Sequence, residues 1–210
     1  MEKLDLTKKY KTYYSAKTSP EMVTIEQARF ISICGKGDPS ERPFTEKIEA
    51  LYPTAYAIKF AFKEKGKDFV VSKLEGLWWF DTDKFQGKSI TSSSVEVPRE
   101  EWEYRLLIRM PDYVTRQDVE NSIRTVTEKK MVALASEIEY FEMMEGACVQ
   151  MLQVGPFSTE PESLKKIEAF STEKRLGQAG LHHEIYLSDF RKVKPEKLKT
   201  ILREPVREIG

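Results

Sequence analysis

Glu184 is the residue of this 210-residue chain whose surroundings most clearly suggest chemistry. It lies in the segment HHEIYLSD at 182–189, whose alternation of polar and apolar residues predicts a β-strand. Because successive side chains of a strand point to opposite faces, Ile185 and Leu187 should enter the helix-packed core, and Glu184 should point away from it. That direction leads either to solvent or to a cleft, where the carboxylate could pair with a cationic ligand or act as a general base.

Aromatic residues could supply the walls of such a cleft. His182 and Tyr186 share the strand face of Glu184. Trp78 and Trp79 are neighbours in a second predicted strand, so one of them points to each side of the sheet. Further aromatic candidates lie on the next strand and on a predicted helix: Tyr104, Tyr56 and Phe60. Each of them can equally be an ordinary core aromatic, but a group contributed by three elements favours an aromatic-walled pocket.

The same inventory excludes several classes of chemistry. The two histidines, His182 and His183, are adjacent and cannot form a His-x-x-x-His metal pair on a helix. The Gly-x-Ser-x-Gly elbow of serine hydrolases is absent. The triplet Gly87-Lys88-Ser89 lacks the earlier glycine of a phosphate loop, and the Ser/Thr-rich stretch ITSSSVEVP after it is expected to be a loop. We expect neither a metal nor a cofactor.

Charge and hydropathy indicate the partners and the compartment. With 34 Lys and Arg against 34 Asp and Glu, the chain lacks the broad positive field that direct nucleic-acid binding needs. No apolar run approaches the ~18 residues of a membrane span, and the N-terminus is too polar for a signal peptide. Cys34 and Cys148 could be two buried thiols, which gives no sign of an oxidising compartment. We therefore expect a cytoplasmic protein with no membrane or nucleic-acid partner.

The elements that must position these residues repeat along the chain. Strand, glycine turn, helix, strand and strand appear twice, and KIEAL at 47–51 is echoed by KIEAF at 166–170. Such a duplication usually gives two α+β halves packed about a pseudo-twofold axis, with a ligand cleft where they meet. We take residues 1–21 as an N-terminal extension and place the halves at about 22–145 and 146–210. The strands are expected at 28–35, 74–81, 103–110, 147–154, 182–189 and within 198–206.

Three helices are expected between these strands. The first spans about 43–66, and Pro53 should kink it or make it restart. Thr115 and Asp118 form a box-like cap for the second. The third begins after a Gly-Pro turn, where either residue of the pair 158–159 can cap it.

The block HHEIYLSD, the segment LYPTAYAIKFAFK at 51–63 and the run 147–206 together resemble the GyrI-like small-molecule-binding family. The resemblance implies duplicated SHS2-type β-α-β-β halves. It also implies that Glu184 stands in an aromatic cleft that receives hydrophobic, often cationic compounds. Regulators of that family carry a helix-turn-helix module before the domain, and the roughly 20 residues before the first strand are too few for one. The chain therefore resembles the stand-alone form.

Some stand-alone members of the family are similar to cyclopropanoid cyclopropyl hydrolases, which detoxify duocarmycin-type DNA-alkylating compounds by adding water to a strained cyclopropane. For such a reaction Glu184 is the candidate base and Tyr104 the candidate donor to the substrate carbonyl. Trp79 or Trp78 would stack on the planar substrate. The alternative is a non-catalytic multidrug-binding or sequestering protein that uses the same cleft, with the glutamate as counter-ion. The sequence does not separate these two hypotheses.

Overall fold

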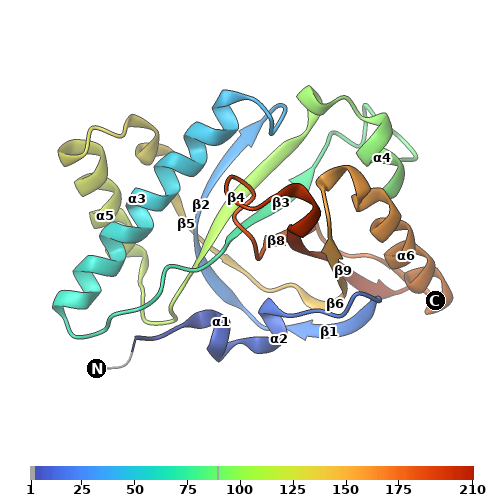
Figure 1. The fold of residues 1–210 in the computed structure, drawn as a ribbon, viewed down its shortest axis with the longest axis horizontal. Coiled ribbons are helices and arrows are strands. Elements are labelled where there is room, and N and C mark those ends of the chain that lie inside the picture. Colours follow the sequence, from blue (N-terminus) through green and yellow to red (C-terminus); the bar gives the residue numbers. More distant parts are fainter. Residues whose placement is uncertain (1–2, 89) are drawn as a thin grey trace.

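An antiparallel sheet forms the centre of the protein (Figure 1). The structure is a computed structural model that describes residues 3–88 and 90–210. In this described part the strands lie in the order β1-β6-β9-β8-β3-β4-β2-β5, and the short strand β7 pairs with β9. Their bounds are β1 Glu21–Ile25, β2 Ala28–Lys36, β3 Leu74–Trp79, β4 Glu103–Met110, β5 Glu139–Met143, β6 Gly146–Val154, β7 Leu176–Gln178, β8 His182–Tyr186 and β9 Lys199–Glu208.

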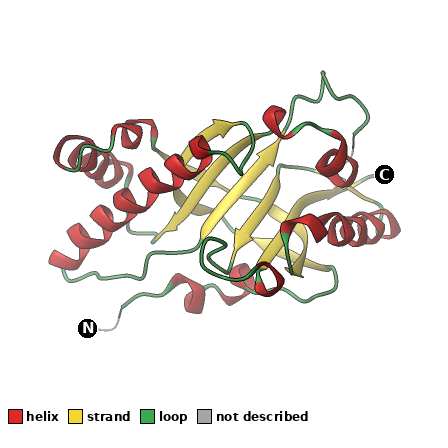
Figure 2. Cartoon of the chain, turned by 45° about the horizontal axis from the view of Figure 1, so that its top comes forward, coloured by secondary structure: helices red, strands yellow, loops and turns green. Residues whose placement is uncertain are grey.

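Helices lie beside the sheet in two groups (Figures 1 and 2). In one group α3 packs against α5 and against β2 and β4, and in the other α6 packs against β6, β9 and α4. Two short helices, α1 and α2, precede β1. The bounds are α1 Leu6–Lys9, α2 Lys11–Tyr14, α3 Arg42–Glu64, α4 Ile90–Glu96, α5 Arg116–Lys129 and α6 Glu160–Glu173, with 3-10 turns at Arg99–Glu101, Ala133–Glu137, Phe157–Thr159 and Pro195–Lys197.

The long helix α3 follows from a regular apolar stripe. The side chains of this stripe are buried against the sheet: Phe44, Ile48, Leu51, Ala55, Ile58 and Phe62. Of the two outcomes expected at Pro53, a kink or a restart, the restart does not occur, because α3 continues through this residue. A proline inside a helix removes one backbone N–H donor, and burial of the apolar stripe on both sides of it outweighs that loss.

The starts of α5 and α6 differ from each other. The predicted capping box of α5 is confirmed: the Asp118 N–H donates to Thr115 Oγ1 at 3.3 Å, and the Thr115 N–H donates to Asp118 Oδ2 at 3.0 Å. At α6 the N-cap residue is Thr159, but its hydroxyl makes no capping bond. It donates to the Pro156 carbonyl at 2.8 Å and accepts from Gln153 Nε2 at 2.7 Å, which ties the start of α6 to β6.

Other local expectations have mixed outcomes. The six predicted strands are confirmed, while β1, β5 and β7 were not foreseen. The Ser/Thr-rich stretch is not a loop, because residues 90–96 form the helix α4; the last residue of the Gly87-Lys88-Ser89 triplet lies outside the described residues. Helix α4 packs on α6, and such tertiary contact overrides weak local propensity. Of the two cysteines, Cys148 is buried and Cys34 is exposed.

The two faces of the sheet have separate cores. On one face α3 and α5 cover residues that include Ile33, Leu106 and Trp78, and α6 covers Val149 and Leu202. On the other face the segment that contains α1 and α2 buries its own side chains against the sheet. That second core comprises Leu6, Tyr13, Tyr14, Ile25, Ala28, Phe30, Leu77, Leu107, Cys148, Ile185 and Ile201. Helices α1 and α2 are therefore packed into the fold.

The architecture is α+β, with mixed helices and antiparallel strands as predicted. Strands β3, β4 and β2 follow one another outward from the contact between β3 and β8, and β8, β9 and β6 do so on the other side. Strand β1 pairs with β6, and β5 pairs with β2. Among the residues described, no helix is long and apolar enough to cross a membrane.

Candidate functional site

Strand β8 carries its polar residues on both faces of the sheet. Glu184 lies opposite Gly76 of β3 and Leu202 of β9, so it shares the face that α6 covers. Ile185 lies on the opposite face, in the core closed by α1 and α2. The predicted alternation is confirmed, but the assignment of faces is wrong: Ile185 does not enter the core under the long helices. The sequence had indicated an extension at residues 1–21 and assigned it no part in the core.

Glu184 forms a buried polar cluster with His182 and Glu204. Glu184 is 8% exposed, and its Oε1 lies 3.4 Å from Nε2 of His182. The other ring nitrogen of His182, Nδ1, contacts Oε1 of Glu204 on β9. Burial disfavours a charged His182, but the two carboxylates outweigh it and hold the pKa of this histidine well above its usual value. The imidazolium therefore stands between two carboxylates.

Aromatic rings adjoin this cluster. The indole Nε1 of Trp78 donates to the hydroxyl of Tyr186 at 3.1 Å, and both groups lie above Gly76. Burial and the neighbouring Glu184 carboxylate raise the pKa of Tyr186 well above its usual value. The rings of Phe157 and Phe190 meet the Tyr186 ring edge-on, at centroid distances of 6.1 and 5.5 Å. Three predicted residues, His182, Tyr186 and Trp78, are thus gathered around Glu184.

Two other predicted residues point elsewhere. Trp79 lies on the opposite face of β3 from Trp78, where its Nε1 donates to Glu103 Oε2 at 3.1 Å, so it is not part of the group around Glu184. Tyr104 is buried, and the end of its ring lies directly over Gly35 of β2. Burial raises the pKa of Tyr104 to about 12. Because β2 and β8 lie on opposite sides of the β3–β4 pair, Tyr104 leans away from Glu184.

Tyr56 and Phe60 are exposed on α3, with their rings stacked at 6.1 Å. Tyr56 lines a cavity of about 340 Å³ between α3 and the loop after β8, and Tyr186 and Phe190 line the same cavity. An adjoining cavity of about 420 Å³ shares Tyr56 with it. In the described part of the chain Glu184 lines neither cavity, so Tyr186 stands between the cavity and the carboxylate.

Glu160 belongs to the same neighbourhood and was not foreseen. Its Oε1 is inaccessible to solvent and, within residues 3–88 and 90–210, has no hydrogen-bond partner. Burial and the negative charge of Glu184 raise its pKa well above the usual value, and the smaller opposite effect of His182 does not reverse this. No sequence signal marks Glu160, because a glutamate in the first turn of a helix is common for dipole reasons alone.

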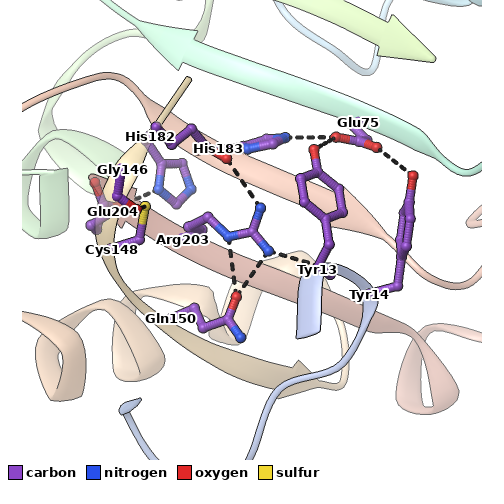
Figure 3. A network of polar contacts seen from close by, with 11 residues as sticks. Tyr13, Tyr14, Glu75, Gly146, Cys148, Gln150, His182, His183, Arg203 and Glu204 are labelled. Atoms are coloured by element: carbon purple, nitrogen blue, oxygen red, sulfur yellow. Dashed lines mark hydrogen bonds and ion pairs between the residues drawn. The ribbon is translucent and has the colours of Figure 1, made fainter. Parts of the chain in front are cut away.

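A second buried network lies on the opposite face of β8 (Figure 3). His183 is fully buried, with Nε2 at 3.0 Å from Glu75 Oε2 and Nδ1 at 2.9 Å from Glu145 Oε1. Burial disfavours its charge, but Glu145 and Glu75 raise its pKa above the usual value. The hydroxyls of Tyr13 and Tyr14 also donate to Glu75, at 2.5 and 3.3 Å. The network therefore fastens α2 to the sheet.

Arg203 completes this network from β9. Its guanidinium is fully buried and donates to Glu145 Oε2 at 3.1 Å, to the Tyr13 carbonyl at 2.8 Å and to Gln150 Oε1 at 2.9 and 3.1 Å (Figure 3). The nearby charges of His183 and Arg203 lower the pKa of Glu145 to about 2, against the effect of burial. Since its charges are paired, this second network is structural in character. Across the described chain, no group of three His, Cys, Asp or Glu side chains is placed to hold a metal ion.

The fold defines an α+β protein, and a buried carboxylate beside aromatic rings is typical of a small-molecule site. The chain belongs to the GyrI-like family, because residues 18–207 match the GyrI-like small molecule binding domain. No curated protein matches the chain significantly.

Solved structures from Listeria innocua are similar over nearly the whole chain. An uncharacterized conserved protein from this organism is 35% identical with a TM-score of 0.86, and the match covers 98% of this chain and 100% of that one. A protein described as a hydrolase from the same organism is 34% identical with a TM-score of 0.83 over the same shares. The EcmrR C-terminal domain, 9% identical with a TM-score of 0.56 over 91% of this chain and 98% of that one, shares the fold alone.

Proposed function

We propose that this protein binds planar aromatic small molecules at the sheet face around Glu184 and hydrolyses them. The observation that carries the proposal is the Glu184 carboxylate beside Tyr186, whose hydroxyl accepts a hydrogen bond from Trp78, where β8 contacts β3. Flat ligands stack on indole and phenol rings, and a carboxylate beside them can take a proton from water. The family match and the 34%-identical Listeria hydrolase support this function.

The binding region lies, in this proposal, in a cleft between two duplicated SHS2-type halves. Two features of the sheet support the duplication. The strand orders β3-β4-β2 and β8-β9-β6 are equivalent when counted outward from the contact of β3 with β8. The strands that precede β2 and β6 are exchanged between the halves, since β1 pairs with β6 and β5 pairs with β2. Both relations are those expected of a pseudo-twofold axis between β3 and β8.

The proposed substrate class is a cyclopropane conjugated to a dienone, as in duocarmycin-type compounds. Water attacks the cyclopropane carbon, Glu184 accepts a proton from the water, and the ring carbonyl becomes a phenol oxygen. The ligand would enter through the cavity of about 340 Å³, whose size suits a small molecule and which Tyr186 lines. Because such compounds attack DNA, their hydrolysis in the cytoplasm would be protective.

The test is the fate of a duocarmycin-type compound incubated with the protein, followed by ultraviolet spectrum and mass. We expect the mass to increase by one water molecule. Glu184→Gln keeps the shape of the side chain but removes the base, so turnover should fall by about 10²–10⁴-fold while neutral planar ligands still bind. Glu103→Gln, which changes a carboxylate on the other face of the sheet, is the matched control and should turn over normally.

Three other results are informative. If Glu184→Gln turns over like the wild type, the site is wrong. If wild-type protein turns over nothing and Glu184→Gln loses affinity for cationic ligands only, the glutamate is a counter-ion and the protein is a multidrug-binding or sequestering one. If neither protein binds planar ligands, the binding function itself is wrong.

A further inference from the structure

Glu204 is the outer carboxylate of the buried cluster, and the hydrolysis proposed above gives it no role. It contacts His182, and His182 contacts Glu184, so Glu204 acts on the candidate base through the imidazolium. We propose that Glu204 is a positioning residue that keeps His182 charged and turned toward Glu184, and thereby keeps Glu184 ionised and able to accept a proton. This inference rests on the proposed hydrolase function.

The strand register holds the three side chains next to one another. His182 and Glu184 are two residues apart on β8, so their side chains leave the same face of the sheet. Leu202 of β9 lies directly opposite Glu184, and the antiparallel register then brings Glu204 next to His182. Nδ1 of His182 contacts Oε1 of Glu204, and Nε2 lies 3.4 Å from Oε1 of Glu184. Each carboxylate therefore takes one ring nitrogen, which fixes the orientation of the ring.

Glu204 lies among apolar side chains on the face of the sheet that α6 covers. Its neighbours on that face of β9 are Leu202 and Val206, and Val149 lies opposite it on β6; all three belong to the core under α6. An ionised carboxylate in such surroundings costs free energy unless it is paired. Replacing a buried ion pair by apolar residues is often neutral or stabilising, so stability alone does not explain this pair. A role at the site explains it.

The second network shows how a structural arrangement of similar groups differs. His183 also lies between two carboxylates, but Arg203 adds a second buried positive charge to that network. In the described part of the chain, His182 is the one cation within ion-pair distance of Glu184 or Glu204. Glu184 therefore has a single, titratable counter-charge.

The charge of His182 depends on the groups around it. Burial disfavours the imidazolium, while the charges of Glu204 and Glu184 raise the pKa of His182 well above its usual value. The other titratable groups beside the cluster are Glu160 of α6 and Tyr186 of β8, and the residue of β3 opposite His182 is an uncharged tryptophan. Without the charge of Glu204, we expect His182 to be neutral at neutral pH. Glu184 would then be a buried carboxylate without a cation, which disfavours its ionised form.

The experiment compares the dependence of turnover on pH in the wild type, Glu204→Gln and Glu145→Gln, with the duocarmycin-type compound as substrate. Glu145→Gln is the matched control, because it makes the same change at Nδ1 of the other buried histidine, His183. In Glu204→Gln we expect kcat at pH 7 to fall by about tenfold or more and the acid limb of the profile to move up by about one pH unit or more. Wild-type kcat should return at alkaline pH, and KM should be unchanged.

The control variants separate this effect from a loss of stability. Both Glu204→Gln and Glu145→Gln remove a buried paired carboxylate and should be less stable than the wild type, but Glu145→Gln should keep the wild-type pH profile. Glu204→Asp retains the negative charge, so its acid limb should move less than that of Glu204→Gln. An equal shift in Glu204→Asp or in Glu145→Gln overturns the proposal, as does a wild-type profile in Glu204→Gln.

A second measurement does not depend on turnover. The chain has two histidines, so nitrogen NMR should show two imidazole groups, and Glu145→Gln identifies the signals of His183. At neutral pH the His182 signals should be those of an imidazolium in the wild type and of a neutral ring in Glu204→Gln. A neutral His182 in the wild type overturns the proposal. If the wild type hydrolyses nothing, the proposed function itself fails, and the positioning role fails with it even where His182 is charged.

Discussion

Gly76 is the position where a single added carbon should most directly disturb the region around Glu184. It lies opposite Glu184 in the register of β3 and β8. A Cβ at this position would be 2.9 Å from Trp78 Nε1 and 3.1 Å from Tyr186 Oη. Since an ordinary contact begins at 3.4 Å, the two groups must withdraw by about 0.5 and 0.3 Å. The Trp78–Tyr186 hydrogen bond, at 3.1 Å, spans the same space and would be disturbed.

The magnitude follows from these contacts. Overpacking of a tight core costs about 1–3 kcal/mol, and a weakened hydrogen bond adds about 0.5–1.5 kcal/mol. Replacing glycine with alanine also lowers the conformational entropy of the unfolded chain, which offsets about 0.4–1 kcal/mol of this destabilisation. We therefore expect Gly76→Ala to lower the free energy of unfolding by about 1–3 kcal/mol, measured by urea denaturation, and to weaken the binding of planar ligands.

A second variant separates this clash from a general effect of alanine in a strand. Trp78→Phe removes the indole nitrogen that the new methyl group would meet. Adding Gly76→Ala to Trp78→Phe should therefore cost less than adding it to the wild type, with a coupling energy of at least about 0.5 kcal/mol. If Gly76→Ala is as stable as the wild type, or if the two changes are additive, the close packing of Trp78 and Tyr186 over Gly76 is refuted.

Two further predictions concern the network that fastens the N-terminal segment. Arg203→Met leaves Glu145 buried without its guanidinium and should lower the free energy of unfolding by about 3–5 kcal/mol, whereas Arg42→Met on the surface should cost less than about 1 kcal/mol; equal losses in urea denaturation would contradict the assignment. Stability should also depend on pH in two directions. The pKa of Glu145 is lowered from 4.5 to about 2, so its contribution is complete above pH 4.5 and is lost as the pH falls through about 2. The pKa of His183 is raised from 6.5, so its contribution is complete below pH 6.5 and is lost as the pH rises through the folded-state pKa. Denaturation midpoints measured from acid to alkaline pH should show this maximum, and a profile that rises steadily above pH 6.5 would contradict it.

Much of the fold was predictable because its signals are local. The apolar stripe of α3 and the capping box of α5 depend on residues three or four positions apart, and both were found where the sequence indicated. The strands β2, β3, β4, β6, β8 and β9 follow from short β-rich runs between turn residues. By contrast, β1, β5 and α4 have weak local signals and form through pairing or packing with distant parts of the chain.

The candidate site, like the fold, was only partly predictable from the sequence. The alternation of β8 determined that Glu184 and His183 point to opposite faces, because successive strand residues always do. It could not determine which face the long helices cover, nor whether Trp78 or Trp79 shares the face of Glu184. Alternation shows only that neighbouring side chains point to opposite faces of the sheet, and it does not show which face each of them takes. Only the tertiary structure decided these points, through strand pairing and the packing of helices at long sequence separation. The same packing buries the Oε1 atom of Glu160 without a hydrogen-bond partner among the described residues, which no local pattern predicts.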